Sequence, residues 1–234
     1  MLRLPLTGTF RYLVLPEFFE QDAVQQMLSR AKQLIEEVDL ATHPMTAFTT
    51  AEQGCHVGDQ YFLDSSSRIS AFFEPSALDP SDPHKLIVPK EQSINKIGHA
   101  LCQLDPVFRS QTLENQRLQD LARELGVHKD PLVLQSMIIC KQPRIGGKVT
   151  QRFVKLPEGG TGFVDLPGSQ KEAETKWDEE SGWKQECCGA GDLVLIHGGV
   201  QHQSPPNLSD KTRFIYTFHM IEGQDGYTYD ERNW

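Results

Sequence analysis

GDLVLIHGGVQHQSPPNLSDKTRFIYTFHM, residues Gly191–Met220, is the stretch from which we interpret the rest of the chain. Leu193–Ile196 is a short apolar run of strand length, and glycine and proline pairs follow it. Neither proline can donate to a sheet ladder. Residues then alternate along Arg213–Met220, as they do on a strand whose side chains point to opposite faces. The stretch predicts strands joined by turns, with His202 and Arg213 on neighbouring strands.

An imidazole and a guanidinium that face one cavity support a specific chemistry. Neutral imidazole is a ligand for first-row metals. An arginine fork binds a carboxylate through two charge-assisted hydrogen bonds, each contributing roughly 1.5–3 kcal/mol. Non-haem iron oxygenases hold their metal with two histidines and one carboxylate, and leave positions open for cosubstrate and oxygen. The plainer alternative is a buried His202 and a surface Arg213 on an ordinary hairpin.

The stretch resembles the phytanoyl-CoA dioxygenase family of Fe(II)/2-oxoglutarate oxygenases. In that family a metal-binding histidine, a serine two residues later and an arginine further on share one motif. His202, Ser204 and Arg213 match it. The resemblance implies that His202 binds iron and that Ser204 and Arg213 hold the remote carboxylate of 2-oxoglutarate. It extends from about residue 10 to residue 220, with one internal gap.

Two further segments carry the resemblance. Ser93–Leu101 is similar to a helix entry whose lysine contacts 2-oxoglutarate, which makes Lys96 a candidate cosubstrate ligand. Pro131–Lys141 is predicted to be a long apolar strand, and its Met137 matches a methionine that lies against the cosubstrate in the family. Both residues also have plainer interpretations, because a lysine is usually solvated and a methionine often fills a gap in the core.

The pattern breaks after the strand Pro131–Lys141. There the family carries an H-x-D motif that supplies the other two iron ligands, but this chain reads GGKVTQR at residues 146–152. The segment that follows looks like one that lies further downstream in relatives. The missing block is on the order of forty residues, or several strands at about 5–6 residues each. A jelly roll needs about eight strands, and this chain looks short by roughly two.

One H-x-D sequence does occur, at His128–Asp130, but it precedes the strand that carries Met137. Nine residues of extended strand span roughly 30 Å, too far for a shared metal unless the chain doubles back. Asp130-Pro131 is also typical of a turn. We therefore expect a turn there. Among the other histidines, we expect His43 and His56 to be solvated. We expect His99 and His197 to have structural roles.

The remaining pattern predicts helices and one domain. Asp22–Val38 has apolar residues at helical spacing, and a second helix lies within Asp105–Leu125, before a glycine suited to a C-terminal cap. We predict a single domain over residues 1–234, mostly β with flanking helices. Its helical part covers about residues 16–130, and a double-stranded β-helix of the jelly-roll or cupin kind covers about residues 131–221.

Composition excludes several classes of partner. The chain has 234 residues and a net charge of −9, which argues against nucleic acid and anionic membranes. No apolar run approaches the ~20 residues of a membrane span. The five cysteines show no C-x-x-C spacing, so we expect reduced thiols in a cytoplasmic protein. Small molecules are the expected partners, and the oligomeric state stays open.

Three functions are compatible with these observations, and they leave open whether the chain is an enzyme. The first is a 2-oxoglutarate-dependent dioxygenase family member, acting on an acyl-CoA-like or other hydrophobic substrate, that is catalytically impaired because only His202 remains of three iron ligands. The second is a non-catalytic module that binds 2-oxoglutarate or another anion at Arg213. The third is an active metalloenzyme with ligands from elsewhere, such as Asp165 or the His128 pair. Metal content and ligand-induced thermal stabilisation distinguish them.

Overall fold

The computed structural model describes residues 12–47, 60–145, 149–155, 161–165, 185–198, 200 and 202–224. Its helices are α1 (Gln21–Glu36), α2 (Gln60–Asp64), α3 (Leu101–Leu104), α4 (Pro106–Gln111) and α5 (Gln116–Leu125). Its strands are β1 (Tyr12–Leu15), β2 (Ile69–Phe73), β3 (Leu78–Asp79), β4 (Asp82–Leu86), β5 (Ile94–His99), β6 (Pro131–Lys141), β7 (Val149–Lys155), β8 (Thr161–Asp165), β9 (Leu193–Ile196), β10 (His202–Ser204) and β11 (Arg213–Glu222). The described part is therefore mostly β with several helices.

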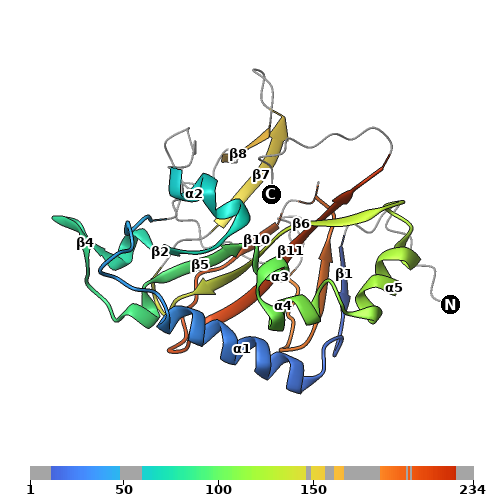
Figure 1. The fold of residues 1–234 in the computed structure, drawn as a ribbon, viewed down its shortest axis with the longest axis horizontal. Helices are drawn as coiled ribbons and strands as arrows, with labels where there is room; N and C mark the ends of the chain where they lie inside the picture. Colours follow the sequence, from blue (N-terminus) through green and yellow to red (C-terminus); the bar gives the residue numbers. More distant parts are fainter. Residues whose placement is uncertain are drawn as a thin grey trace. The chain divides into compact units, whose positions relative to one another are not determined.

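The chain divides into two compact units, and each is described by itself. The first unit comprises residues 1–5, 25–147 and 206–234, and the second comprises residues 6–24 and 148–205. A four-stranded antiparallel sheet in the order β11-β6-β5-β2 forms the centre of the first unit (Figure 1). β6 pairs with β11 from Pro131 opposite Glu222 to Lys141 opposite Arg213, with one register shift between His219 and Met220.

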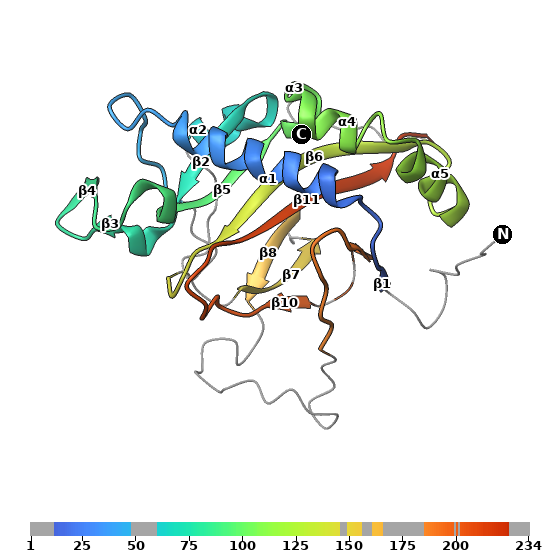
Figure 2. The same ribbon diagram turned by 90° about the horizontal axis from the view of Figure 1, so that it is seen from below.

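Helices cover one face of this sheet, as Figure 2 shows for α1, α3 and α4. The apolar stripe of α1 is buried at Ala31, Leu34 and Ile35. These residues belong to one core cluster with inward residues of the sheet: Ala71, Phe73, Ile97, Ile138 and Cys140. Burial of a stripe spaced three and four residues apart is what drives an amphipathic helix onto a sheet.

Side chains alternate along each strand, so the residues between these core positions point to the opposite face. We call that surface the Lys96 face. By register it carries Phe72 of β2, Lys96 and Gly98 of β5, Met137, Ile139 and Lys141 of β6, and Arg213, Ile215 and Thr217 of β11. Three of the predicted cosubstrate residues, Lys96, Met137 and Arg213, therefore lie on the same face of the central sheet.

The second unit pairs segments that are far apart in sequence. β1 pairs antiparallel with β9, from Tyr12 opposite Ile196 to Leu15 opposite Leu193. A separate three-stranded sheet has the order β10-β7-β8. Gly191, with φ of 97°, lies where an added Cβ would be 2.8 Å from the Phe19 carbonyl oxygen. Only glycine adopts this conformation at so close an approach without strain.

Most of the predicted elements are confirmed, and one is wrong. The strand Pro131–Lys141 and the long helix near residues 22–38 are present. Ser93–Leu101 is not a helix entry, because Ile94–His99 is a strand paired with β2 and β6, and the short helix α3 begins only at Leu101. The β3–β4 hairpin was not predicted from the sequence. The single-domain assignment stays a prediction.

No helix in the described ranges is long and apolar enough to cross a membrane.

Candidate functional site

Lys96 is a buried cation on the central sheet. Only 5% of it is exposed, and its Nζ lies 5.3 Å from the ring centre of Phe62 and 5.6 Å from that of Phe72. Burial lowers its pKa to about 7. Such rings stabilise a cation by about 0.5–2 kcal/mol, whereas each pKa unit corresponds to about 1.4 kcal/mol, so desolvation dominates. The interpretation of Lys96 as a solvated lysine is wrong.

Two more cations share this face. Arg213 stands directly opposite Lys141, and Lys96 stands opposite Ile139, two residues before Lys141. With about 4.8 Å between strands and 3.4 Å per residue, the Cα atoms of Lys96 and Arg213 lie ~12 Å apart. Burial and then repulsion from Arg213 lower the pKa of Lys141. Three cations on adjacent strands of one sheet make a surface that favours an anion.

Among the residues that the structure describes, the carboxylate of Glu74 lies near these cations and partly offsets their charge. Glu74 is 5% exposed, and burial raises its pKa. The amide of Asn95 donates to it over 2.7 Å, and Lys141 attracts it, which opposes that rise. Sequence reasoning missed both Glu74 and Lys141. Lys141 could have been found, because it lies four residues after Met137 on one strand and so shares its face.

Met137 lies at the centre of the Lys96 face, opposite Gly98 and Thr217. It is 8% exposed, and a Cβ added at Gly98 would be 2.8 Å from the Met137 Cβ. β5 and β6 therefore approach closely here because β5 carries a glycine. The structure is compatible with both interpretations of Met137, as a core residue and as one that borders a cosubstrate.

His99 is a buried neutral histidine, as its expected structural role requires. It is 1% exposed, and its Nδ1 lies 2.7 Å from the Ser65 hydroxyl. Burial lowers its pKa to about 3, and repulsion from Lys96 and His219 adds to this. The ring contacts Phe62 and Phe72, the same rings that flank Lys96.

His202 and Ser204 lie in the second unit, on β10, whereas Lys96, Met137 and Arg213 lie in the first. β10 pairs with β7 and β11 pairs with β6, so the prediction that His202 and Arg213 occupy neighbouring strands is wrong. The residues between them explain this. Two prolines follow β10, and the Asn207 amide donates to the Lys141 carbonyl over 2.8 Å, which directs the chain toward β6.

The described residues do not fit an iron ion. They contain no group of three histidine, cysteine, aspartate or glutamate side chains that could hold a metal. His202 is exposed, and its Nδ1 donates to the Val200 carbonyl over 2.9 Å, which leaves Nε2 as its lone-pair nitrogen. Asp165 of β8 lies two strands away from His202 of β10. Gln151 of β7, between them, is paired with both residues.

The His128–Asp130 sequence lies in a bend of the chain immediately before β6. The Glu222 carboxylate accepts from the backbone amides of Lys129 and Asp130 over 2.8 and 3.0 Å. His128 Nδ1 lies 3.8 Å from the same carboxylate. These contacts give the segment a role in holding the end of the β6–β11 pair.

The other histidines have mixed outcomes. His43 was expected to be solvated, and this is wrong: its Nε2 lies 3.0 Å from the Ala71 carbonyl oxygen and 2.8 Å from the Tyr61 hydroxyl. Burial lowers its pKa. His56 lies outside the described residues. His197 is exposed, and its structural role stays a prediction.

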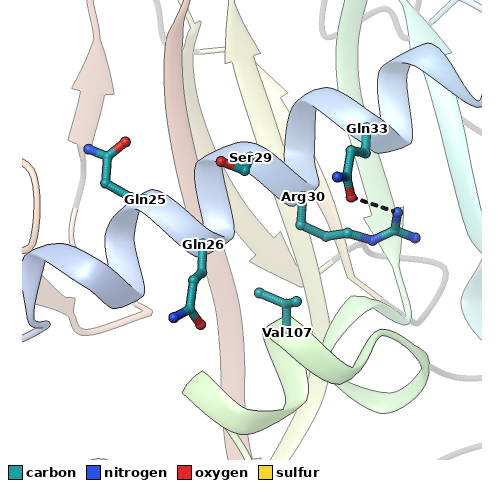
Figure 3. Close-up of a pocket in the computed structure, with 6 residues that line it drawn as sticks. All are labelled: Gln25, Gln26, Ser29, Arg30, Gln33 and Val107. Atoms are coloured by element: carbon teal, nitrogen blue, oxygen red, sulfur yellow. Dashed lines mark hydrogen bonds between the residues drawn. The ribbon is translucent and has the colours of Figure 1, made fainter.

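A groove of about 350 Å³ lies in the helical layer, away from the Lys96 face (Figure 3). It is lined by Gln25, Gln26, Ser29, Arg30, Gln33 and Val107. Arg30 is engaged there, because its guanidinium donates to Asp105 over 2.7 Å and to Glu37 over 2.8 Å. The groove therefore offers amides and a neutralised cation, and we assign it no chemistry.

Comparison with known proteins gives consistent matches. The family model for phytanoyl-CoA dioxygenase (PhyH) matches residues 12–153 and 158–215. The phytanoyl-CoA dioxygenase domain-containing protein 1 homolog of Caenorhabditis elegans is 31% identical over 268 positions, covering 95% of this chain and 91% of its own length. The phytanoyl-CoA dioxygenase of Arabidopsis thaliana is 34% identical over 258 positions, covering 95% and 88%.

A solved structure is also similar at a low level. EctD from S. alaskensis, in a crystal structure with 2-oxoglutarate and 5-hydroxyectoine, is 17% identical with a TM-score of 0.47, covering 90% of this chain and 71% of that one.

Proposed function

The chain belongs to the phytanoyl-CoA dioxygenase (PhyH) family, and from this premise we propose that it binds 2-oxoglutarate or a similar dicarboxylate without oxidising it. The observation that carries the proposal is the set of cations on one face of the central sheet: Lys96, Lys141 and Arg213. These residues combine a guanidinium fork, which binds carboxylates at two points, with the amines of two buried lysines. The residues that match the family's cosubstrate contacts are among them.

The lack of turnover follows from the missing iron ligands. The alignment of 268 positions with the C. elegans relative exceeds the 234 residues of the whole chain by 34, so at least 34 of its positions have no counterpart here. The family match is interrupted between residues 153 and 158, close to the predicted break at residues 146–152. Both observations support an internal deletion that removes the H-x-D motif and about two strands of a jelly roll.

The family name suggests an acyl-CoA or related hydrophobic acid as the substrate of intact members. We propose this class for the family's chemistry and assign no substrate turnover to this chain. Arg213 would hold the remote carboxylate and Met137 would border the carbon chain of the dicarboxylate. Ser204 is proposed as a further carboxylate ligand from the resemblance alone.

The binding proposal is tested with 2-oxoglutarate in the presence of a chelator. We expect weak, metal-independent binding in equilibrium dialysis, and we expect Arg213→Ala to weaken it about ten- to hundred-fold, because a bidentate charged contact is lost. Arg144→Ala is the matched control, since its side chain is 71% exposed and pairs with Asp210. Equal affinity in the parent and Arg213→Ala would remove the basis for this site.

The absence of turnover is tested by succinate formation with Fe(II), ascorbate and 2-oxoglutarate. We expect no succinate above the background of free iron, and no change in His202→Ala, because three protein ligands on one side of the metal are needed. Turnover in the parent that disappears in His202→Ala would contradict the proposal. The variants to make next would then be His128→Ala, Asp130→Ala and Asp165→Ala.

A further inference from the structure

We propose that Lys96 forms a reversible covalent imine with the ketone carbon of a 2-oxo dicarboxylic acid held on the Lys96 face. The inference rests on the proposed binding function and assigns a chemical step to the same site. When a cosubstrate chelates iron through its keto oxygen, the metal occupies the ketone group. In a chain without the iron ligands, the ketone is open to another partner.

The position of Lys96 suits a nucleophile. It is 5% exposed and lies between two aromatic rings, Phe62 and Phe72, so its amine is shielded from bulk water. Lysines become nucleophilic when an apolar pocket or a neighbouring cation disfavours their charged form. Burial brings the pKa of Lys96 to about 7, so a large fraction of the amine is neutral near neutral pH.

Lys141 and Arg213 supply the second requirement, a place for the acid's carboxylates. They stand opposite each other on β6 and β11. Lys96 is paired with Ile139, which lies two residues before Lys141 on β6. The estimated ~12 Å between the Cα atoms of Lys96 and Arg213 is a distance that two long side chains and a short dicarboxylate span together. In the proposed complex the exposed Arg213 holds one end of the acid, and Lys96 reaches its ketone.

The step requires no oxidant or reductant. The Lys96 Nζ lone pair attacks the ketone carbon, a C–N bond forms, and the carbonyl oxygen takes a proton to give a carbinolamine. The C–O bond then breaks, water leaves, and the nitrogen loses its second proton to form C=N. Amine and ketone thus yield imine and water, and hydrolysis reverses the reaction. The product is a covalently held dicarboxylate rather than an oxidised one.

The test is reductive trapping in the presence of a chelator. The full chain is incubated with 2-oxoglutarate and cyanoborohydride, which reduces an imine to a stable secondary amine, and is then analysed by intact-mass and peptide mass spectrometry. We expect one adduct with the mass of 2-oxoglutarate less one oxygen atom, mapped to Lys96. Glutarate, which has both carboxylates but no ketone, should suppress the adduct by competition.

Matched variants test which lysine carries the trapped adduct. Lys96→Arg keeps the charge but should give no adduct, whereas Lys85→Arg, whose parent side chain is 67% exposed, should leave trapping unchanged. Arg213→Ala should reduce the adduct about ten- to hundred-fold. Peptide mapping of the parent identifies the labelled lysine even if Lys96→Arg does not fold. An adduct on Lys141, or one spread over exposed lysines, would overturn the inference.

Equilibrium dialysis without cyanoborohydride separates this inference from the function on which it rests. Binding that depends on Arg213, without an adduct at Lys96, would overturn the imine and leave the dicarboxylate site in place. Neither binding nor an adduct would overturn both proposals. Binding together with an adduct at Lys96 that glutarate suppresses would support both.

Discussion

Single residues on the central sheet make stability depend on pH. His99 has a folded-state pKa of about 3, against about 6.5 for an exposed histidine. Between these values the unfolded chain binds a proton that the folded chain does not. The contribution of His99 is therefore fully present above pH ~6.5 and is lost as the pH falls toward 3.

We expect the free energy of unfolding of the parent to fall between pH 7.5 and pH 5, and that of His99→Gln to fall less. The measurement is urea unfolding at several pH values, with His84→Gln at an exposed position as the control. Parallel profiles for the parent and His99→Gln would show that His99 does not set the pH dependence.

Gly98 tests the close packing of β5 on β6. An alanine Cβ there would lie 2.8 Å from the Met137 Cβ and 3.3 Å from the Ser136 carbonyl oxygen. We expect Gly98→Ala to destabilise the fold by about 1–3 kcal/mol, as overpacking does. Because the contact is with a Cβ, adding Met137→Ala should not restore stability. Gly198→Ala is the control, because a Cβ added there would meet no atom within 4 Å beyond its chain neighbours. Equal melting temperatures of Gly98→Ala and the parent would contradict this packing.

At the scale of elements, Asp105 connects two helices. Its carboxylate accepts from the Val107 amide over 3.0 Å at the start of α4 and from Arg30 Nε of α1 over 2.7 Å. We expect Asp105→Ala to cost roughly 2–4 kcal/mol, because a cap and the partner of a buried ion pair are lost together. Asp105→Asn should cost less in thermal unfolding, because its amide oxygen still caps the helix. Equal losses in the two variants would show that the cap contributes nothing.

Elements with a long periodic pattern could be predicted from the sequence, and short ones could not. β6 agrees with its prediction at both ends, since Pro131–Lys141 is an unbroken β-prone run. Ile94–His99 was not recognised as a strand because Lys96 and Gly98 interrupt its apolar pattern, although both residues are buried. The β3–β4 hairpin lies among prolines that favour a loop. Its pairing is specified by tertiary contacts rather than by local pattern.

The site shows the same limit. Lys96, Met137 and Arg213 were predicted from the resemblance, and register places them on one face of one sheet. That His202 belongs to another sheet could not be predicted, because the choice of strand partner after two prolines depends on the Asn207 side chain and the end of β6. The partners of His43 were also hidden, because Ala71 and Tyr61 are distant in sequence.

At the scale of the whole molecule, the proposed deletion would leave unpaired strand edges in a sheet fold. Among the described strands of the central sheet, β11 and β2 stand at the ends of the order. A ten-residue strand such as β11 at an edge is a template for pairing with another chain. We expect a broad thermal transition and light scattering that rises with concentration. A sharp two-state melt with a monomeric gel-filtration peak would contradict a missing barrel segment.

The pairing of β1 with β9 has a consequence for the synthesis of the chain. Tyr12–Leu15 leaves the ribosome early, and its partner Leu193–Ile196 is among the last strands to be made. At about 5–20 residues per second the wait lasts on the order of ten to forty seconds. During that time an apolar strand is without its partner, so the yield of folded chain should depend on whether a chaperone shelters the nascent N-terminal segment.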